Sequence, residues 1–312
     1  MTPGPGYHAA MPFAWINGSF VDEDTASISV RDTGLLHAAS VFTTMRSYAG
    51  RVFKLDRHLA RLRGSCDALF VPLVQKDDAL ADACAELLGR NGLADARLRL
   101  TVTRGRQTTD PLHGPRLEPT TILTAAALDA YPEEFYRKGM TVIVLDEQKL
   151  NPYDVQAGHK TSNYLSRFAA LREANRRGGG EALWFNVHNY LQSGSVSNVL
   201  LVKDGKLHTP PTIEELRDAA VKAATTYPKS NVLPGVTRSV VFDLAGEAGI
   251  EVVRRGLTIT DLLEADEAFI TNSSMGVMPV CRIERKALGK DEPGPVTKKL
   301  MAAYAATVAA TA

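Results

Sequence analysis

Lys160 is the residue of this chain whose setting is best suited to covalent chemistry. It stands in the run Ala157-Gly158-His159-Lys160-Thr161-Ser162-Asn163-Tyr164, just before a segment with helical spacing of apolar residues. A lysine amine is nucleophilic only in its uncharged form, which burial and nearby positive charge favour by lowering its pKa. We expect His159 and the start of the following helix to provide such surroundings. An isolated lysine is usually a solvated surface residue, so this interpretation needs support from elsewhere in the chain.

Three other segments carry groups that bind phosphate, although each alone also fits an ordinary helix or loop. Arg61 lies on a basic helical stretch, and a guanidinium binds phosphate through a planar fork of hydrogen bonds. Residues 233–237 open a helix, whose first N–H groups and positive dipole end attract anions. Residues 271–274 follow a strand and add hydroxyl donors. A lysine upstream of such loops is what an aldehyde cofactor with a phosphate tail requires, which predicts pyridoxal 5′-phosphate.

Composition is that of a soluble globular protein. The 312 residues are 45% hydrophobic and 23% charged, which is enough for two domains and a large core. The net charge of +1 gives no reason to expect nucleic acid or an anionic membrane as a partner. The first twenty residues contain no apolar stretch of a signal peptide, and we expect no membrane span and a cytoplasmic location.

The cysteines and the missing motifs exclude several classes of enzyme. Cys66, Cys84 and Cys281 are widely spaced without a Cys-x-x-Cys pair, so we expect buried free thiols and no metal site. The sequence contains no P-loop, no Gly-x-Gly-x-x-Gly after a strand and no His-Glu-x-x-His. The run 192–196 lacks the second glycine of a serine-hydrolase elbow.

The expected elements divide the chain near its middle. Residues 1–127 read as a small α+β domain, because a hairpin turn at Asn17-Gly18 and further strands accompany two amphipathic helices. The strands are expected at 41–48, 97–103 and 120–126, and the helices at 55–69 and 76–90. Residues 128–138, with Pro132 and a cluster of charges, are expected to be an interdomain linker. Residues 139–312 alternate strands with helices and predict a larger α/β domain that binds the cofactor.

Thr212 to Asn231 reads as an insertion between a hairpin and the 233–237 segment. Its apolar residues have helical spacing, at Ile213, Leu216, Ala220 and Ala223. Such a helix either covers the site as a lid or decorates the surface, and the sequence does not decide between them.

Nearly the whole chain resembles the fold type IV pyridoxal-phosphate enzymes, from Ile16-Asn17-Gly18 to Met278-Pro279-Val280. This class IV aminotransferase family has a D-amino-acid aminotransferase-like architecture and includes branched-chain aminotransferases and aminodeoxychorismate lyases. The resemblance implies that Lys160 forms the Schiff base and shuttles the reacting proton. It also implies a homodimer with active sites near the interface. The positions that match the family's cofactor-binding residues are Arg61, Tyr164, Ser193, Asn198, Leu233, Val236, Thr237, Ser273 and Ser274.

Two of these positions have specific implied roles, and a third departs from the pattern. Tyr164 matches a tyrosine that bonds the phenolic oxygen of the cofactor, and Leu233 matches an apolar residue packed on its ring. Ser193 stands where the family carries a glutamate that keeps the pyridine nitrogen protonated. We therefore expect a neutral or weakly bonded ring nitrogen, or a carboxylate recruited from elsewhere.

Signals for the subfamily conflict. The runs 41–46 and 271–280 look like aminodeoxychorismate lyases, whereas Phe42 with Arg46 beyond it is similar to branched-chain aminotransferases. The expected substrate-binding residues are therefore Phe42, Arg46 and Arg104. Our first expectation is an aminotransferase that acts between an amino acid, with branched-chain ones as candidates, and a 2-oxo acid. A lyase that eliminates pyruvate, or a degenerate pyridoxal-phosphate-binding protein, is the alternative.

Overall fold

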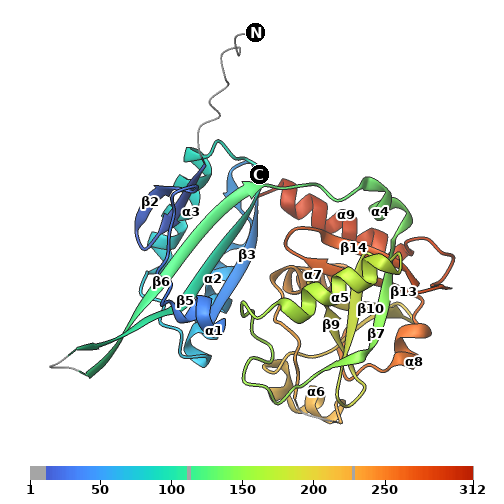
Figure 1. Ribbon diagram of the computed structural model, residues 1–312. Helices are drawn as coiled ribbons and strands as arrows, with labels where there is room; N and C mark the ends of the chain where they lie inside the picture. Colours follow the sequence, from blue (N-terminus) through green and yellow to red (C-terminus); the bar gives the residue numbers. More distant parts are fainter. Residues whose placement is uncertain (1–11, 111–113, 227–228, 312) are drawn as a thin grey trace, which may run out of the picture. The chain divides into compact units, whose positions relative to one another are not determined.

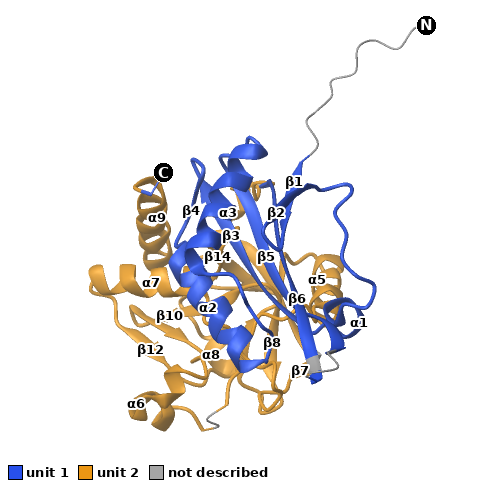
Figure 2. Ribbon diagram, turned by 90° about the vertical axis from the view of Figure 1, so that its left-hand side faces the viewer, with its two compact units in different colours: residues 1–128, 311–312 blue, residues 129–310 orange. Residues whose placement is uncertain are grey.

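A computed structural model describes residues 12–110, 114–226 and 229–311 (Figure 1). The chain separates into two compact units, and each is described by itself (Figure 2). Unit 1 comprises residues 1–128 and 311–312, and unit 2 comprises residues 129–310. The expected linker at 128–138 falls almost wholly in unit 2. It contains α4 (Glu133–Lys138), where Phe135 and Tyr136 pack against the core of that unit.

Unit 1 is a six-stranded antiparallel sheet in the order β2-β1-β6-β5-β3-β4. Its elements are β1 (Phe13–Ile16), β2 (Ser19–Asp22), α1 (Thr33–His37), β3 (Ser40–Tyr48), β4 (Arg51–Val52), α2 (Leu55–Ala68), α3 (Asp77–Arg90), β5 (Ala96–Asp110) and β6 (Gly114–Ala127). Asn17 and Gly18 connect β1 to β2 with φ angles of 50° and 100°, as a tight hairpin turn requires. The predicted α+β character of this region is confirmed.

The core of unit 1 lies between its sheet and α2 and α3. Leu98, Leu100 and Val102 alternate along β5 and are buried with apolar residues of both helices. Strand alternation places Arg97 and Arg99 on the opposite face of the sheet. One face of the sheet therefore builds the core, and the other carries basic side chains.

Unit 2 contains a nine-stranded mixed sheet, ordered β12-β11-β10-β13-β14-β7-β8-β9 with β15 paired to β14. Besides α4 its elements are β7 (Met140–Leu150), α5 (Leu165–Arg176), β8 (Glu181–Asn186), β9 (Leu191–Gly194), β10 (Asn198–Lys203), β11 (Lys206–Thr209), η1 (Glu215–Arg217), α6 (Ala219–Ala223), α7 (Val236–Glu247), β12 (Val252–Arg254), α8 (Ile259–Leu263), β13 (Glu267–Asn272), β14 (Gly276–Ile283), β15 (Lys286–Ala287) and α9 (Pro295–Ala309). The strand β7 pairs in parallel with β8 and β14, as expected for an α/β domain.

Helices cover both faces of this sheet around β7 and β8. Ile143 and Trp184 pack with small residues of α5, while Val142 and Leu183 belong to a second cluster that includes Leu262 of α8. Every residue of β8 is buried, which is typical of a strand covered on both sides. The loops that follow these strands therefore start from a rigid base.

The spacing of apolar residues after Lys160 predicts that Leu165, Phe168, Leu171 and Ala174 form the buried face of the helix, and this prediction is partly wrong. Leu165 and Phe168 are 80% and 62% exposed, whereas the buried residues of the helix are Ala170 and Ala174. Small side chains let the helix backbone approach Trp184 closely, so the alanine stripe rather than the larger residues faces the sheet.

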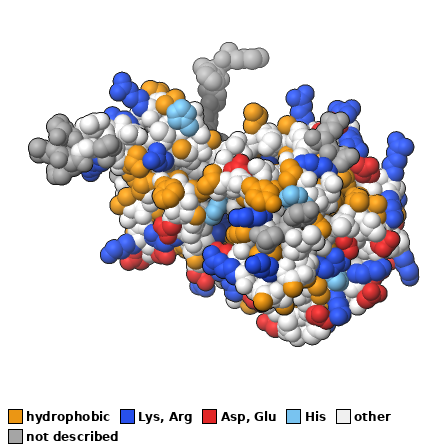
Figure 3. Space-filling model, turned by 90° about the horizontal axis from the view of Figure 1, so that it is seen from below, with side chains coloured by type: hydrophobic (Ala, Val, Ile, Leu, Met, Phe, Trp, Pro, Cys, Tyr) orange, Lys and Arg blue, Asp and Glu red, His pale blue; other side chains and the backbone are white. Residues whose placement is uncertain are grey.

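The surface and the thiols agree with the composition. On the face drawn in Figure 3, acidic and basic side chains are interspersed. No helix in the described ranges is long and apolar enough to cross a membrane. Cys66, Cys84 and Cys281 are free and buried, as predicted. Burial raises the pKa of Cys66 and of Cys84 to about 12, so these thiols are unreactive at neutral pH.

Candidate active site

The predicted nucleophile Lys160 lies in the loop between β7 and α5 of unit 2. Its amine donates a hydrogen bond to the hydroxyl oxygen of Tyr164, 2.9 Å away, and both side chains are partly buried. Tyr164 is also the residue that precedes the first turn of α5, so the rigid helix positions the phenol. The loop itself is held by Thr161, whose hydroxyl donates to Gln156 Oε1 at 2.9 Å. A partly buried amine beside a phenol is a suitable arrangement for covalent attachment and proton transfer.

His159 does not provide the positive charge that the sequence led us to expect beside Lys160. Burial lowers the pKa of His159 below its ordinary value of 6.5, although the nearby carboxylate of Glu214 opposes the shift. The imidazole is therefore neutral near pH 7. The expected helix start is also displaced, because α5 begins five residues after the lysine.

The expected phosphate-binding turn before α7 is held by Asn198. The side-chain amide of Asn198 donates to the carbonyl of Leu233 at 2.9 Å, and its Oδ1 lies where a Cβ at position 235 would be. Gly235 is required for this close approach, and as N-cap it offers no side chain to the first N–H groups of the helix. The N–H groups of Val236 and Thr237 thus begin the helix without an intrahelical acceptor, which is the arrangement that an anion site requires.

The second predicted hydroxyl loop joins β13 to β14 beside this turn. Asn272 organises it, because its Oδ1 accepts from the N–H groups of Ser274 at 2.9 Å and Met275 at 2.8 Å. Its Nδ2 donates to the carbonyl of Val196 in the turn between β9 and β10. Since Thr271 pairs with Asn198 across the sheet, the segment carrying Ser273 and Ser274 lies next to the strand that holds the α7 turn.

Ser193 lies on β9, directly across the sheet from Trp184. It is only 5% exposed, and its Oγ has no hydrogen-bond partner among the described residues. A buried hydroxyl without a partner is costly, which marks it as a group that a bound molecule would satisfy. Arg167 ties this strand to the lysine, because it donates to the Ser195 carbonyl at 2.8 Å and lies over the Tyr164 ring, 5.5 Å from its centroid.

The turn after Ser193 is supported by the buried carboxylate of Glu181. The carboxylate accepts from the backbone N–H of Ala182, Ser195 and Val196 and from the hydroxyl of Ser197. Burial raises the pKa of this carboxyl, and the four donors offset part of the rise. Because its oxygens are already engaged, Glu181 shapes the turn.

These features together fit an aldehyde cofactor with a phosphate tail. The fit rests on the lysine amine beside a phenol, the uncapped start of α7 that depends on Gly235, and the unsatisfied hydroxyl of Ser193. The cofactor would supply an aldehyde for the amine of Lys160 and an electron-withdrawing ring, and the chain would supply its orientation.

Comparison with known proteins identifies the family. Residues 40–283 match the model of class IV amino-transferases. A putative branched-chain-amino-acid aminotransferase from Methanocaldococcus jannaschii is 36% identical over 289 residues, which cover 92% of this chain and 93% of that protein. The chain belongs to the class IV aminotransferase family.

Solved structures agree with this assignment. The branched-chain amino acid aminotransferase of Escherichia coli superposes with a TM-score of 0.83 and 29% identity, covering 95% of this chain and 94% of that one. The 4-amino-4-deoxychorismate lyase of Pseudomonas aeruginosa has a TM-score of 0.75 and 29% identity, covering 93% and 97%. The expected fold type IV architecture is confirmed, and so is pyridoxal 5′-phosphate, which class IV aminotransferases use. Transamination is supported and the lyase alternative is not favoured.

In this class IV aminotransferase the predicted phosphate ligand Arg61 lies on α2 of unit 1. Its Nη2 donates to the Thr43 hydroxyl at 2.9 Å, and the same hydroxyl is 2.8 Å from His58 Nδ1. The buried His58 and Thr43 thus fix the direction of the guanidinium. The role of Arg61 toward the residues of unit 2 remains a prediction.

The predicted substrate-binding residues also lie in unit 1. Phe42 and Arg46 share one face of β3, because they are four residues apart on a strand. Phe42 is buried, and the Arg99 guanidinium lies 3.6 Å from the centroid of its ring. The Arg46 guanidinium lies 4.4 Å from the ring centroid of Tyr48. Arg104 is anchored through its backbone, which donates to Ala39 O at 2.8 Å.

Sequence reasoning missed the supporting residues Arg167 and Glu181. Each contacts the turn at 194–197 through partners that are 14 to 28 residues away along the chain. No local spacing rule connects them, so only the folded sheet reveals their roles. The only available signal was a carboxylate at the start of the apolar run of β8.

Proposed function

We propose that this class IV aminotransferase moves the amino group between a branched-chain amino acid and a 2-oxo acid, with Lys160 as the residue that attaches the cofactor. The observation that carries the proposal is the hydrogen bond from Lys160 Nζ to Tyr164, in a loop braced by α5. The amine has a reachable phenol with which to exchange a proton. The branched-chain preference is supported by the relatives from Methanocaldococcus jannaschii and Escherichia coli.

The remaining residues divide between cofactor and substrate. The first turn of α7, with Val236 and the hydroxyl of Thr237, would bind the phosphate together with Ser273 and Ser274. Asn198 acts on this site through Leu233, whose carbonyl it holds. Leu233 would pack on the ring of the cofactor, and Ser193 would donate its unpaired hydroxyl to the ring nitrogen.

In unit 1, Arg61 is the further phosphate ligand that we propose. Phe42, Arg46 and Arg104 would form the substrate pocket, in which a guanidinium pairs with the substrate carboxylate.

A homodimer in the cytoplasm completes the proposal. Leu165 and Phe168 are large, exposed apolar residues at the start of α5, next to the lysine loop, and a second copy would cover them. Three free, buried cysteines fit a reducing compartment. Sedimentation velocity of the purified chain should give a dimer that Phe168→Glu weakens.

The test of the function is reduction of the purified protein with borohydride, followed by mass mapping and an amine screen. We expect the cofactor on Lys160, and transfer from valine, leucine or isoleucine to 2-oxoglutarate. Label on another lysine, or none, would overturn the assignment. Pyruvate release without an acceptor would instead indicate the lyase, and bound cofactor without turnover would indicate a degenerate binding protein.

A further inference from the structure

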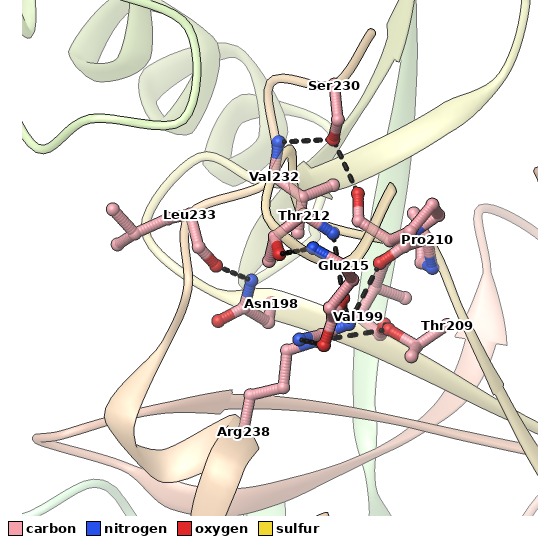
Figure 4. Close-up of polar contacts among 11 residues, drawn as sticks. Asn198, Val199, Thr209, Pro210, Thr212, Glu215, Ser230, Val232, Leu233 and Arg238 are labelled. Carbon is pink, nitrogen blue, oxygen red and sulfur yellow. Dashed lines mark hydrogen bonds and ion pairs between the residues drawn. The ribbon is translucent and has the colours of Figure 1, made fainter. Parts of the chain in front are cut away.

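The segment between β11 and α7 is packed against unit 2 and is neither a loose decoration nor a single helix. Its described residues, 212–226 and 229–232, form the short helices η1 and α6, and Leu216, Val221 and Val232 are buried. We refer to these residues as the clasp segment. Its two ends lie next to each other beside the turn that opens α7 (Figure 4).

The first end of the clasp segment grips α7 through an ion pair. Glu215 accepts two hydrogen bonds from Arg238, from Nη1 to Oε1 and from Nη2 to Oε2, each of 2.9 Å. The Arg238 side chain is 4% exposed and that of Glu215 is 18% exposed. Burial would raise the pKa of Glu215, but the hydrogen bonds and charge of Arg238 lower it below the ordinary value, so the carboxylate is ionised.

The other partners of Arg238 among the described residues are uncharged. Its Nη2 also donates to the Pro210 carbonyl at 3.1 Å, and its guanidinium lies 4.4 Å from the centroid of Phe242. Glu215 is itself held by Thr212, because its carboxylate accepts from the Thr212 N–H and its own N–H donates to the Thr212 hydroxyl. Glu215 is thus the counter-ion of an otherwise buried cation.

The second end of the clasp segment is closed by Ser230. Its hydroxyl donates to the Pro211 carbonyl at 2.6 Å and accepts from the Val232 N–H at 3.0 Å. Asn231 adds two bonds, from its N–H to Gln192 Oε1 and from its side chain to the Asn151 carbonyl. The chain is therefore fixed immediately before Leu233.

The clasp segment also touches the loop of the lysine. A Cβ at Gly158 would lie in van der Waals contact with Val232 O at 3.6 Å and with Ile213 Cγ2 at 3.9 Å. The same segment thus borders both the turn at 233–237 and the loop that carries Lys160.

We propose that the clasp segment positions the phosphate-binding turn, and that Glu215 is its principal positioning residue. Arg238 is the third residue of α7, so its fixed guanidinium sets the rotation of the helical turn that contains Val236 and Thr237. Glu215 does not touch the bound phosphate and acts through Arg238. This inference rests on the proposed function, because it assigns to that turn the phosphate of the cofactor.

The decisive experiment compares pyridoxal 5′-phosphate with pyridoxal, which lacks the phosphate, as ligands of the apo-protein. Glu215→Gln removes the charge and keeps the shape of the side chain. We expect its dissociation constant for pyridoxal 5′-phosphate to rise about tenfold, as is typical when a residue that holds a direct ligand in place is removed. The dissociation constant for pyridoxal should not change. The matched control is Glu251→Gln, which removes an exposed ion pair with Lys206.

Loss of affinity for both ligands, or for neither, would overturn the inference. A merely structural role would lower the melting temperature of the apo-protein and leave the ratio of the two dissociation constants unchanged. If Glu215→Gln does not fold, Ser230→Ala is the second variant. It removes the hydrogen bonds that close the other end of the segment and leaves the ion pair of the buried Arg238 intact. It should weaken pyridoxal 5′-phosphate selectively, and equal binding of both ligands to it and to the wild type would contradict the proposal.

The proposed function and this inference fail differently. If the wild-type protein attaches no cofactor at Lys160, the proposed function is wrong. If the wild type binds it and Glu215→Gln binds it equally well, only the role of the clasp segment is wrong.

Discussion

Lys160 Nζ and the hydroxyl oxygen of Tyr164 are 2.9 Å apart, and the two residues are four positions apart in the sequence. The phenol ring is in turn held against Phe168, with ring centroids 6.0 Å apart, and lies under the Arg167 guanidinium. The tyrosine is therefore a fixed partner for the amine.

We predict that Tyr164→Phe keeps the cofactor attached at Lys160 but slows amino transfer. Loss of one hydrogen bond costs about 0.5–1.5 kcal/mol, which corresponds to roughly a 2- to 10-fold lower kcat. Steady-state kinetics with a branched-chain amino acid measure the effect. Tyr153→Phe is the control, because that hydroxyl contacts His188 at an exposed position. A loss of borohydride trapping in Tyr164→Phe would show that the phenol is needed for attachment itself.

Ser193 leads to a second prediction, because its buried hydroxyl has no partner among the described residues. If it faces the ring nitrogen of the cofactor, Ser193→Glu places a carboxylate there and keeps that nitrogen protonated. We expect a shifted visible absorption band and faster amino transfer. Ser193→Ala should show neither the band shift nor the faster amino transfer of Ser193→Glu. Identical spectra and rates in all three proteins would mean that position 193 does not meet the ring.

Arg61 is predicted to contribute to cofactor affinity through its charge. A hydrogen bond to a charged group contributes about 1.5–3 kcal/mol, so Arg61→Gln should raise the dissociation constant of pyridoxal 5′-phosphate roughly 10- to 100-fold. Arg63→Gln on the same helix is the control, since Arg63 pairs with Asp77 at an exposed position. Fluorescence titration of the apo-proteins measures both. Equal affinity in the two variants would remove Arg61 from the phosphate site.

Elements set by local rules were predictable from the sequence. The hairpin at Asn17-Gly18 follows from two positions with positive φ, and the β5 strand from the alternation of Leu98, Leu100 and Val102. The start of α7 was equally readable, because Pro234 and Gly235 precede an apolar helical pattern. In each case neighbouring residues carry the whole signal.

Features that depend on distant partners were not predictable. The buried stripe of α5 consists of alanines because Trp184 lies beneath it, and no pattern in the helix reports that neighbour. The clasp segment has one long helical pattern but folds as two short helices, because Asp218 between them is extended and its carboxylate accepts from the N–H groups of Ala220 and Val221 at the start of α6. The ion pair between Glu215 and Arg238, 23 residues further along the chain, likewise has no signal in the local pattern.

Asp261 provides a prediction about acid stability. It closes the capping box at the start of α8, accepts from the Thr258 N–H, and pairs with Arg255 at 2.6 Å. Partial burial would raise its pKa, but the hydrogen bonds of Arg255 and Thr258 lower the pKa to about 2 from an ordinary 3.8. Between these two values the unfolded chain binds a proton that the folded chain does not. The stabilisation is therefore complete above pH 3.8 and is lost as the pH falls toward about 2.

Asp261→Asn should accordingly lower the free energy of unfolding by about 1–2 kcal/mol at neutral pH, and by less near pH 3, because the wild-type carboxylate is then losing its advantage. Urea unfolding followed by circular dichroism at both pH values measures the difference. Asp266→Asn is the control, since Asp266 is an exposed partner of Lys203. A gap between Asp261→Asn and wild type that stays constant from neutral pH to about pH 3 would show that the ion pair does not hold the carboxyl ionised, and that capping geometry alone accounts for its effect.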